Sequence, residues 1–254
     1  MITIIILGAG NVAKHIYTAF TNQKSVRIIQ CYNRKGVSIH KDQKKENITK
    51  NLRDLIEADI YIIAVSDDAI SEVSDNLPFT NKLIVHTSGS VPMLSMNSVN
   101  RRGVFYPLQT FSINSTIKYS TIPFCIEAEK DTDRLLLKKL ALILSPKVYD
   151  ISSEQRSVLH VAAVFVNNFT NHLFSVGNQI CSENEIPFEI LHPLIQETAK
   201  KITVLDPDKA QTGPAIRKDN KTLQRHLHIL KKDSQKELYT LLTQSIQSNY
   251  GKKL

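Results

Sequence analysis

Short runs of apolar, mostly β-branched residues recur along the first 150 positions, and between them apolar residues return every three or four positions. Continuous apolar runs are typical of strands covered on both faces, and the wider spacing is typical of amphipathic helices. The pattern predicts strands at residues 2–7, 26–32, 60–65, 83–86, 104–106, 124–127 and 147–151. It predicts helices at residues 12–20, 52–58, 67–75 and 131–144. This alternation predicts an α/β fold with a doubly wound, mostly parallel sheet.

The pattern changes near residue 151. Two serines and a glutamate at residues 152–154 are typical of a helix start, because serine caps a helix and an acid suits its first turn. Residues 158–174 are apolar nearly all round, which predicts a buried helix. We therefore expect two domains: residues 1–151 with the sheet, and an all-helical domain of residues 152–254.

A glycine-rich turn, Gly8-x-Gly10-x-x-Ala13, lies between the first predicted strand and the first predicted helix. In a dinucleotide-binding turn the first glycine permits a tight turn, the second lets the backbone approach a pyrophosphate, and the small third residue allows close helix packing. The helix start then offers free N–H groups to the phosphates. An ordinary glycine turn is the alternative. The cofactor-binding residues predicted here are Gly8, Ala9, Gly10, Asn11 and Val12.

The end of the second strand bears on which dinucleotide binds. NAD sites carry an acidic residue there for the ribose 2′-hydroxyl. This chain instead has Asn33, Arg34 and Lys35, with two cations and no acid. These three residues therefore predict NADP as cofactor, with NAD as the less favoured choice. The alternative is that Arg34 and Lys35 belong to an exposed loop.

Three further turns follow the third, fourth and fifth predicted strands. In open α/β sheets, ligands bind beyond the carboxyl ends of the strands. We expect the first turn beside the cofactor ribose, and the other two beside the nicotinamide and the substrate. The residues predicted for these roles are Val65, Ser66 and Thr87 at the cofactor, and His86, Ser88 and Gln109 at the reaction.

Several segments together resemble a known family: GAGNVA, AVSDDAI, HTSGS, FYPLQTF, an Asn-Asn pair in the long apolar helix, and TGPAIRKD. Over nearly its whole length the chain resembles Rossmann-like proteins with a DUF2520 domain. It is more distantly similar to pyrroline-5-carboxylate reductases, 6-phosphogluconate and β-hydroxyacid dehydrogenases, and F420-dependent NADP oxidoreductases. The resemblance implies a Rossmann-type NADP-binding domain and a helical C-terminal domain that forms homodimers. It implies no particular substrate.

The chain departs from the β-hydroxyacid dehydrogenases in one respect. Those enzymes place a catalytic lysine in the first long helix after the sheet domain, whereas no lysine occurs here between Lys147 and Lys200. That chemistry is therefore not carried over.

The predicted long helix contains polar residues in apolar surroundings. At about 100° per residue, His160, Asn167 and Asn171 fall on one stripe, with Asn168 beside it. Histidine has an ordinary pKa of ~6.5, which suits proton transfer during a hydride transfer, and asparagines can hold a carbonyl or an imine. His160, Asn167 and Asn168 are thus predicted catalytic residues, with His86 as the alternative proton donor. The competing interpretation is a buried polar group satisfied within a helix interface.

A second candidate site lies near residue 212. Thr212-Gly213-Pro214 is typical of a helix start, with threonine as cap and proline in the first turn. Free N–H groups there, assisted by Arg217, would bind a substrate carboxylate or phosphate. Thr212, Gly213 and Arg217 are therefore predicted substrate-binding residues. A plain interhelical turn, with Arg217 paired to Asp219 or to another acid, is the alternative.

Composition narrows the class of protein. The chain has 254 residues, of which 42% are hydrophobic and 22% charged, which is enough apolar material for a core. No apolar run approaches the ~20 residues needed to span a bilayer, and the first segment lacks the basic start of a signal peptide. We therefore expect a cytoplasmic protein without a membrane partner. Its three cysteines show no metal-ligand spacing, so we expect reduced thiols and no metal.

The net charge of +8 is compatible with nucleic-acid binding, but the lysine-rich stretches contain few aromatic residues. Attraction for a phosphorylated cofactor or an anionic metabolite suits the motifs better. The favoured hypothesis is an NADP-dependent oxidoreductase that transfers a hydride to or from a small carbonyl, imine or alcohol at the cleft between the domains. The alternatives are a non-catalytic dinucleotide sensor and a basic interaction protein. We expect a small-molecule substrate, a homodimer and no nucleic-acid partner.

Overall fold

The computed structural model describes residues 1–112 and 117–250. The chain divides into two compact units, Met1–Ala163 and Val164–Leu254. Helix α4 (Ser153–Ala163) belongs to the first unit, because its early residues bond to the sheet. The sequence predicts a domain boundary after residue 151, with cofactor binding before it and substrate binding after it. That division of functions stays a prediction.

The first unit is built on one eight-stranded sheet with the order β3-β2-β1-β4-β5-β6-β7-β8. All neighbouring strands are parallel except β6 and β7, so the prediction of a doubly wound, mostly parallel sheet is confirmed. The strands are β1 (Ile2–Leu7), β2 (Val26–Tyr32), β3 (Ile48–Thr49), β4 (Ile60–Ile63), β5 (Leu83–His86), β6 (Arg101–Pro107), β7 (Phe124–Ala128) and β8 (Val148–Asp150). The chain order reverses direction at β1, where a ligand crevice is expected.

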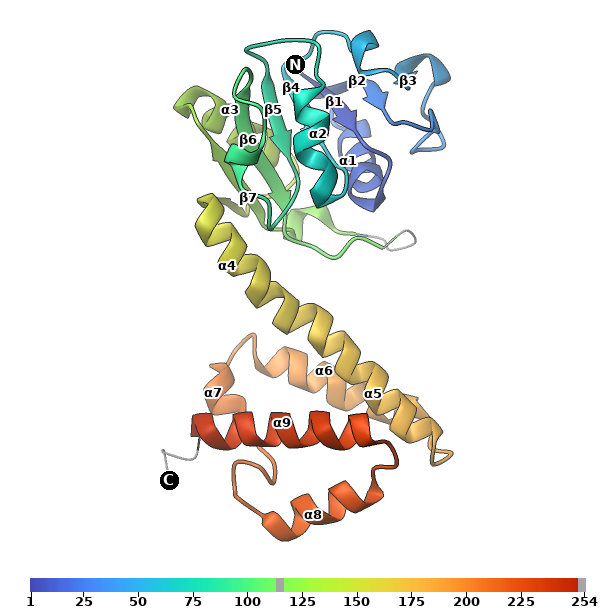
Figure 1. Cartoon of the computed structure of the whole chain (residues 1–254), viewed down its shortest axis with the longest axis vertical. Coiled ribbons are helices and arrows are strands. Elements are labelled where there is room, and N and C mark those ends of the chain that lie inside the picture. Colours follow the sequence, from blue (N-terminus) through green and yellow to red (C-terminus); the bar gives the residue numbers. More distant parts are fainter. Residues whose placement is uncertain (113–116, 251–254) are drawn as a thin grey trace. The chain divides into compact units, whose positions relative to one another are not determined.

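Two apolar clusters cover the two faces of this sheet. On one face, Ile4 and Ile6 of β1 pack with α1 (Asn11–Thr21) and α3 (Asp131–Leu142). On the other face, Ile5 and Leu7 pack with residues around α2 (Ile70–Asp75). Figure 1 shows these helices against the sheet. Burial on both faces explains why the strands appear in the sequence as unbroken apolar runs.

One prediction for the segment between β2 and β4 is wrong, and the short strand β3, which pairs there with Cys31 and Tyr32, was not predicted. Residues 52–58 form a 3-10 turn at Leu52–Asp54 and no helix. Side chains from the sheet hold this backbone instead. Gln30 donates to the carbonyl of Asp54, and the hydroxyl of Tyr61 donates to the carbonyl of Ile56.

The second unit is helical. It begins with a π-helical segment, Val164–Phe169. The further helices are α5 (Thr170–Ser182), α6 (His192–Lys201), α7 (Pro207–Ala210), α8 (Asn220–Ile229) and α9 (Asp233–Tyr250). No helix within the described ranges is long and apolar enough to cross a membrane.

The prediction that residues 158–174 form a buried helix is wrong for the single chain. Val158 is 71% exposed, Phe165 62% and Phe169 50%. The residues are helical, but many of their apolar side chains are exposed. Apolar character all round therefore does not distinguish burial inside one chain from burial against a partner.

The predicted helix start at Thr212 is also wrong. Gly213 has a φ of +110°, and the residues after it form turns. Helix α8 begins only at Asn220, where the carboxylate of Asp219 accepts the N–H of Thr222 at 3.1 Å. An aspartate with this bond is a better cap than Thr212, since it satisfies a free N–H of the first turn.

Cys31, Cys125 and Cys181 are buried free thiols. Burial raises the pKa of Cys31 to about 12 and that of Cys125 to about 11, so both stay protonated at neutral pH. Within the described residues, no three His, Cys, Asp or Glu side chains are grouped as metal ligands would be.

Candidate cofactor and active site

The turn between β1 and α1 forms one wall of the candidate cofactor site. Gly8 has a φ of +138°, and a Cβ atom there would lie 2.1 Å from the carbonyl oxygen of Ala64. This backbone and this close approach require glycine. Gly10 is open instead, because a Cβ atom there would meet nothing within 4 Å among the described residues. The turn thus packs tightly at Gly8 and leaves free space at Gly10.

Helix α1 begins directly after this turn without a side-chain cap. Gly10 is its N-cap residue and has no side chain that could accept a hydrogen bond, and the first turn holds no acid. Uncapped N–H groups and the positive end of the helix dipole favour an anion at this position.

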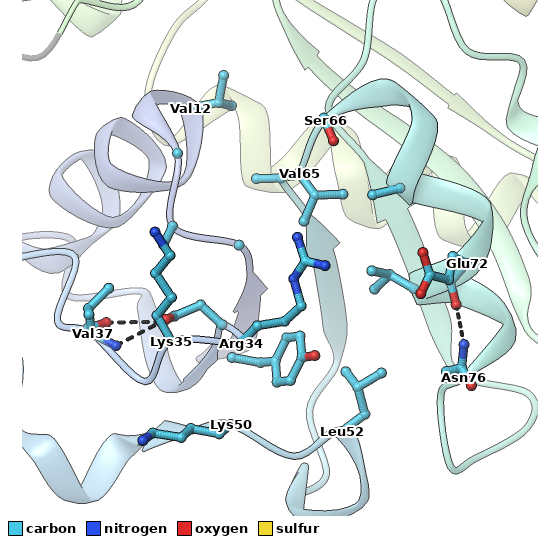
Figure 2. Close-up of a pocket in the computed structure, with 18 of the residues that line it drawn as sticks. Val12, Arg34, Lys35, Val37, Lys50, Leu52, Val65, Ser66, Glu72 and Asn76 are labelled. Carbon is cyan, nitrogen blue, oxygen red and sulfur yellow. Dashed lines mark hydrogen bonds between the residues drawn. The ribbon is translucent and has the colours of Figure 1, made fainter.

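A pocket of about 1080 Å³ opens beside the glycine turn. In Figure 2, Arg34 extends toward Val65, while Lys35 and Lys50 come from two separate segments. Of the residues predicted to bind the cofactor, all except Thr87 line this pocket: Gly8, Ala9, Gly10, Asn11, Val12, Asn33, Arg34, Lys35, Val65 and Ser66. Their binding to a cofactor stays a prediction.

Four cations line the pocket: Arg34, Lys35, Lys50 and Arg53. The backbone that carries the first two is shaped by Asn33, whose amide side chain both donates to and accepts from the backbone of Val37. Gly36 follows with a φ of +61°, and a Cβ atom there would lie 2.3 Å from Cε of Lys50. The turn after β2 therefore lies directly against the Lys50 side chain. Glu72, on α2, is the one carboxylate among the described lining residues.

Sequence reasoning missed several lining residues, above all Lys50 and Arg53. Both follow β3, a two-residue strand placed between lysines and asparagines. So short a strand leaves no periodic signal. Thr49 and Asn51 are the residues that could have indicated this turn from the sequence, because both types shape turns after strands. Thr49 Oγ1 accepts the N–H of Asn51, and Asn51 Oδ1 accepts the N–H of Arg53.

Helix α1 also holds the loop that follows β6. Asn11 Nδ2 donates to the carbonyl of Phe111 at 3.0 Å, and His15 Nε2 lies 3.0 Å from the carbonyl of Ser112. The ring of His15 also contacts that of Phe111, with centroids 4.9 Å apart. Gln109 and Phe111 of this loop line the pocket, so α1 fixes both the glycine turn and the facing wall.

The turn after β5 is built around His86, which is fully buried. Its Nδ1 accepts the N–H of Ser88 at 3.1 Å, so its proton lies on Nε2. Burial, and then the nearby positive charge of Arg156, lower the pKa of His86 to about 3. Ser88 Oγ accepts the N–H groups of Ser90 and Val91. His86 is therefore a neutral structural group at pH 7, which argues against the alternative that it donates the proton.

Thr87 takes a different place from the predicted one. It is buried, and its hydroxyl donates to the carbonyl of Ile63 at 3.3 Å. It is absent from the residues that line the pocket. Its contacts join the ends of β4 and β5 rather than facing a cofactor.

His160 meets the sheet at Tyr106 and Gly89. Its Nδ1 lies 3.3 Å from the hydroxyl of Tyr106. A Cβ atom on Gly89 would lie 2.5 Å from the same nitrogen and 2.8 Å from the Tyr106 hydroxyl. Gly89 therefore makes room for the pair. Burial raises the pKa of Tyr106 to about 12, so its hydroxyl stays protonated at neutral pH and can donate to His160.

The remaining predicted residues lie in the second unit. Asn167 and Asn168 are exposed and belong to the π-helical segment. A π-turn has more residues than an α-turn, so the regular spacing that placed His160, Asn167 and Asn171 on one stripe does not hold through it. The catalytic role of these asparagines stays a prediction.

Thr212 and Gly213 do not form the predicted helix start, so the free N–H groups expected there have no basis in the structure. Arg217 is exposed in the turn that follows. Hydrogen bonds from Thr222 are the main reason why the pKa of Asp219 is lowered, and the positive charge of Arg217 adds to this effect. The alternative of a turn with Arg217 near Asp219 therefore fits the structure better than a substrate site.

Comparison with known proteins places these features in a family. Residues 3–89 match the model of coenzyme F420-dependent NADP oxidoreductases, and residues 122–246 match DUF2520, a domain of unknown function. A putative NADP oxidoreductase from Bacteroides fragilis is 38% identical, with 97% of this chain and 98% of that chain covered and a TM-score of 0.84. The chain belongs to the Rossmann-like, DUF2520 domain-containing proteins.

Other solved structures share the fold of this DUF2520 protein at lower identity. A Thermotoga maritima protein is 19% identical over 98% of this chain and 99% of that chain, with a TM-score of 0.75. The pyrroline carboxylate reductase of Plasmodium falciparum, solved with NADP bound, is 13% identical over 98% of this chain and 97% of that one, with a TM-score of 0.63. No curated protein sequence matches the chain. The first unit therefore has the fold of NAD(P)-dependent oxidoreductases.

Proposed function

We propose that this DUF2520 protein is an NADP-dependent oxidoreductase that transfers a hydride to or from a small carbonyl, imine or alcohol. The observation that carries the proposal is the pocket beside the glycine turn, with Arg34, Lys35, Lys50 and Arg53 along it. The relatives add to it, since the Bacteroides fragilis protein is described as a putative NADP oxidoreductase.

The pocket residues fit a phosphorylated dinucleotide. Gly8 lets the strand and the turn pack without a side chain, and Gly10 leaves open space where backbone can approach a pyrophosphate. The uncapped start of α1 suits its negative charge. A volume of about 1080 Å³ is at the upper end of ligand pockets, as an extended dinucleotide requires.

The cations favour NADP over NAD. Arg34 and Lys35 follow β2, where NAD-binding proteins carry an acid, and Lys50 and Arg53 add two charges from the next segment. Arginine binds phosphate through paired hydrogen bonds, so Arg34 and Arg53 suit a 2′-phosphate. Structural neighbours have been solved with either cofactor, so the choice remains part of the proposal.

His160 is the proposed proton donor and acceptor. When bound, the nicotinamide of NADPH supplies the hydride. A carbonyl or imine that accepts a hydride also needs a proton, and His160 lies at the sheet edge where the carboxyl ends of β5 and β6 meet. The Tyr106 hydroxyl donates to Nδ1, which leaves the proton on Nε2. When the ring takes up a second proton, Nδ1–H donates to the Tyr106 oxygen, and Nε2 gives its proton to the substrate, which leaves His160 neutral. In the reverse direction the neutral ring takes the proton of the substrate at Nε2.

Other residues have supporting roles in this proposal. Gln109 lines the pocket, where its amide would contact the cofactor, while Ser88 shapes the turn that carries Gly89. Asn167 or Asn168 would orient the carbonyl, imine or alcohol group. The absence of a lysine between Lys147 and Lys200 leaves a non-catalytic dinucleotide sensor as the second candidate function.

We also propose a homodimer formed through the long helix. Val158, Val161, Phe165, Phe169 and Leu173 follow one another along this helical stretch, and all five are apolar and exposed. Phe165 and Phe169 contact each other edge to face, with centroids 5.0 Å apart. An exposed apolar stripe of this kind is typical of a subunit interface, and the family resemblance indicates a second copy as its partner.

NADPH oxidation with a panel of keto acids, aldehydes and imines tests the enzymatic proposal. We expect turnover with at least one compound, and His160→Ala should lower kcat by about 100-fold, the usual worth of a positioned acid–base group. NADPH affinity should be unchanged. His228→Ala, an exposed histidine on α8, is the matched control and should keep full activity. Tight NADPH binding without turnover on any compound would favour the sensor, and full activity of His160→Ala would exclude this residue as the donor.

A further inference from the structure

Arg156 is an unusual residue to find buried. Only 1% of its side chain is exposed, and it lies on α4 one helical turn before His160. Residues four apart on a helix share a face, so whatever fixes Arg156 also fixes the direction in which His160 points. Within the described part of the chain, its side-chain hydrogen bonds go to Glu127, Val91 and Ser153, none of which lines the pocket.

Arg156 and Glu127 join three segments of the first unit. Arg156 Nη1 donates to Glu127 Oε2 of β7 at 2.6 Å. Arg156 Nη2 donates to the carbonyl of Val91 at 2.6 Å, in the segment just after the turn that contains Gly89. The planar guanidinium suits two such bonds in fixed directions, which a lysine could not make.

Ser153 completes the same network at the start of α4. Its N–H and its hydroxyl both donate to Glu127, at 2.9 and 2.8 Å, and its hydroxyl oxygen accepts the N–H of Met93 at 2.9 Å. The Glu127 carboxylate therefore caps the first turn of α4 and also forms the ion pair with Arg156. The network holds α4, β7 and residues 91–93 in one arrangement.

The same arrangement sets the distance between His160 and its partners. The turn that carries Gly89 is held from both ends: Ser88 Oγ accepts the N–H of Val91, and the carbonyl of Val91 accepts from Arg156. His160 approaches this turn so closely that a Cβ atom on Gly89 would lie 2.5 Å from its Nδ1. A small rotation of α4 would therefore break the 3.3 Å contact with Tyr106.

We propose that Arg156 and Glu127 are positioning residues, which hold α4 and the turn at Gly89 so that His160 Nδ1 faces the Tyr106 hydroxyl. This inference rests on the proposed role of His160 and deepens it. A buried ion pair is weak evidence for stability, because desolvation offsets the attraction between the charges. The structure supports a geometric role instead, because the pair joins α4, which carries His160, to β7 and to the segment after Gly89.

The double variant Arg156→Met/Glu127→Leu tests the proposal while keeping the fold. Apolar residues of similar volume often replace a buried pair without loss of stability, whereas a single change would leave a buried charge unpaired. The matched control is Arg101→Met/Asp133→Leu. It removes another ion pair, in which Nη1 of Arg101 in the sheet lies 2.6 Å from Oδ1 of Asp133 in the first turn of α3. Arg101 begins β6, and Tyr106 lies near the other end of that strand.

We expect the Arg156/Glu127 variant to bind NADPH with unchanged Kd and to lose about 10- to 100-fold in kcat, as misplacement of a catalytic group does. In a His160→Ala background the same change should have no further effect on kcat, because the pair acts through His160. If the pair had a purely structural role, the kcat loss from His160→Ala and the kcat loss from the Arg156/Glu127 change would multiply in the combined variant. The control variant should retain wild-type kcat. Unchanged kcat in the folded double variant, or multiplied losses, would overturn the proposal.

A second readout needs no turnover. The nitrogen NMR signals of His160 report which ring nitrogen carries the proton. In the wild type we expect the Nε2–H form, held by Tyr106, and in the Arg156/Glu127 variant a mixture of both forms. If His160 proves irrelevant to turnover but its tautomer still depends on Arg156, the proposed role of His160 as proton donor fails and the positioning of its ring by Arg156 stands. An unchanged tautomer would refute the positioning role itself.

Discussion

Gly8 and Gly10 lie two positions apart in one turn, yet the structure gives each a different reason to be glycine. At Gly8 both the φ of +138° and the carbonyl of Ala64 exclude a side chain. At Gly10 the φ is −73°, which any residue adopts, and there is free space for a Cβ atom. The fold therefore does not require glycine at position 10, and a requirement for it would come from the dinucleotide that we propose.

Alanine substitutions separate these two reasons. Gly8→Ala should lower the free energy of unfolding by about 1–3 kcal/mol, because it adds backbone strain and a clash. Gly10→Ala should change it by less than about 1 kcal/mol, the scale of an N-cap effect, and yet weaken NADPH binding strongly. Urea unfolding and calorimetric titration of both variants measure this. Loss of stability at Gly10, or unimpaired NADPH binding there, would contradict the reading of the turn.

His86 predicts a pH dependence of stability. Its pKa of about 3 in the folded chain lies below the ordinary value near 6.5, so below pH 6.5 the unfolded chain binds a proton that the folded chain does not. Stability should therefore fall as the pH drops from 6.5 toward 3, by about 1.4 kcal/mol per pH unit.

His86→Asn isolates this contribution, because its amide oxygen can still accept the N–H of Ser88. Between pH 6.5 and pH 5 the wild type should lose about 2 kcal/mol more than the variant in urea unfolding. Parallel pH profiles for the two proteins would show that His86 is not held neutral.

At the scale of elements, the interaction between α1 and the loop after β6 gives a further test. Asn11→Ala removes the bond to the carbonyl of Phe111 and leaves the glycine turn unchanged. A hydrogen bond of this type contributes about 1 kcal/mol, so NADPH affinity should fall by roughly 5-fold. Thr18→Ala, whose hydroxyl bonds only within α1, is the control and should bind NADPH normally. Equal affinities in all three proteins would mean that the loop does not contribute to the pocket.

Elements whose character is local were predictable from the sequence. The runs at β1, β4 and β5 are buried on both faces, so their composition alone predicts them, and the glycine turn follows from its place after β1. Leu52–Asp54 was mispredicted because Gln30 and Tyr61, distant in the sequence, supply its hydrogen bonds. The cations Lys50 and Arg53 were missed for a similar reason, since the pairing of β3 with β2 brings them to the pocket.

The site at His160 shows the same limit. A polar residue in an apolar helix suggested it, but Tyr106 and Gly89 join it only through the placement of α4 on the sheet. The expected stripe from His160 to Asn171 assumed an unbroken α-helix. A π-helical segment cannot be derived from residue spacing, because its sequence is as apolar as that of its neighbours.

At the scale of the whole molecule, the exposed apolar stripe predicts a dimer. Phe165→Glu/Phe169→Glu places two charges on it and should give a monomer in sedimentation or light scattering, while the wild type has twice the chain mass. Val204→Glu, an exposed apolar residue outside the stripe, is the control and should leave the dimer intact. A monomeric wild type, or a dimer that survives both charges, would contradict the proposed interface.

Calorimetric titration with NADPH and NADH tests the central claim most directly. The wild type should bind one NADPH per chain and should bind NADH at least about 10-fold more weakly. This difference is the affinity that one charge-assisted hydrogen bond to the 2′-phosphate contributes. Arg34→Asp should abolish that difference, while Lys24→Asp, an equal charge change at an exposed residue outside the pocket, should preserve it. If neither dinucleotide binds, or if both bind equally to the wild type, the pocket is not the NADP site that this account requires.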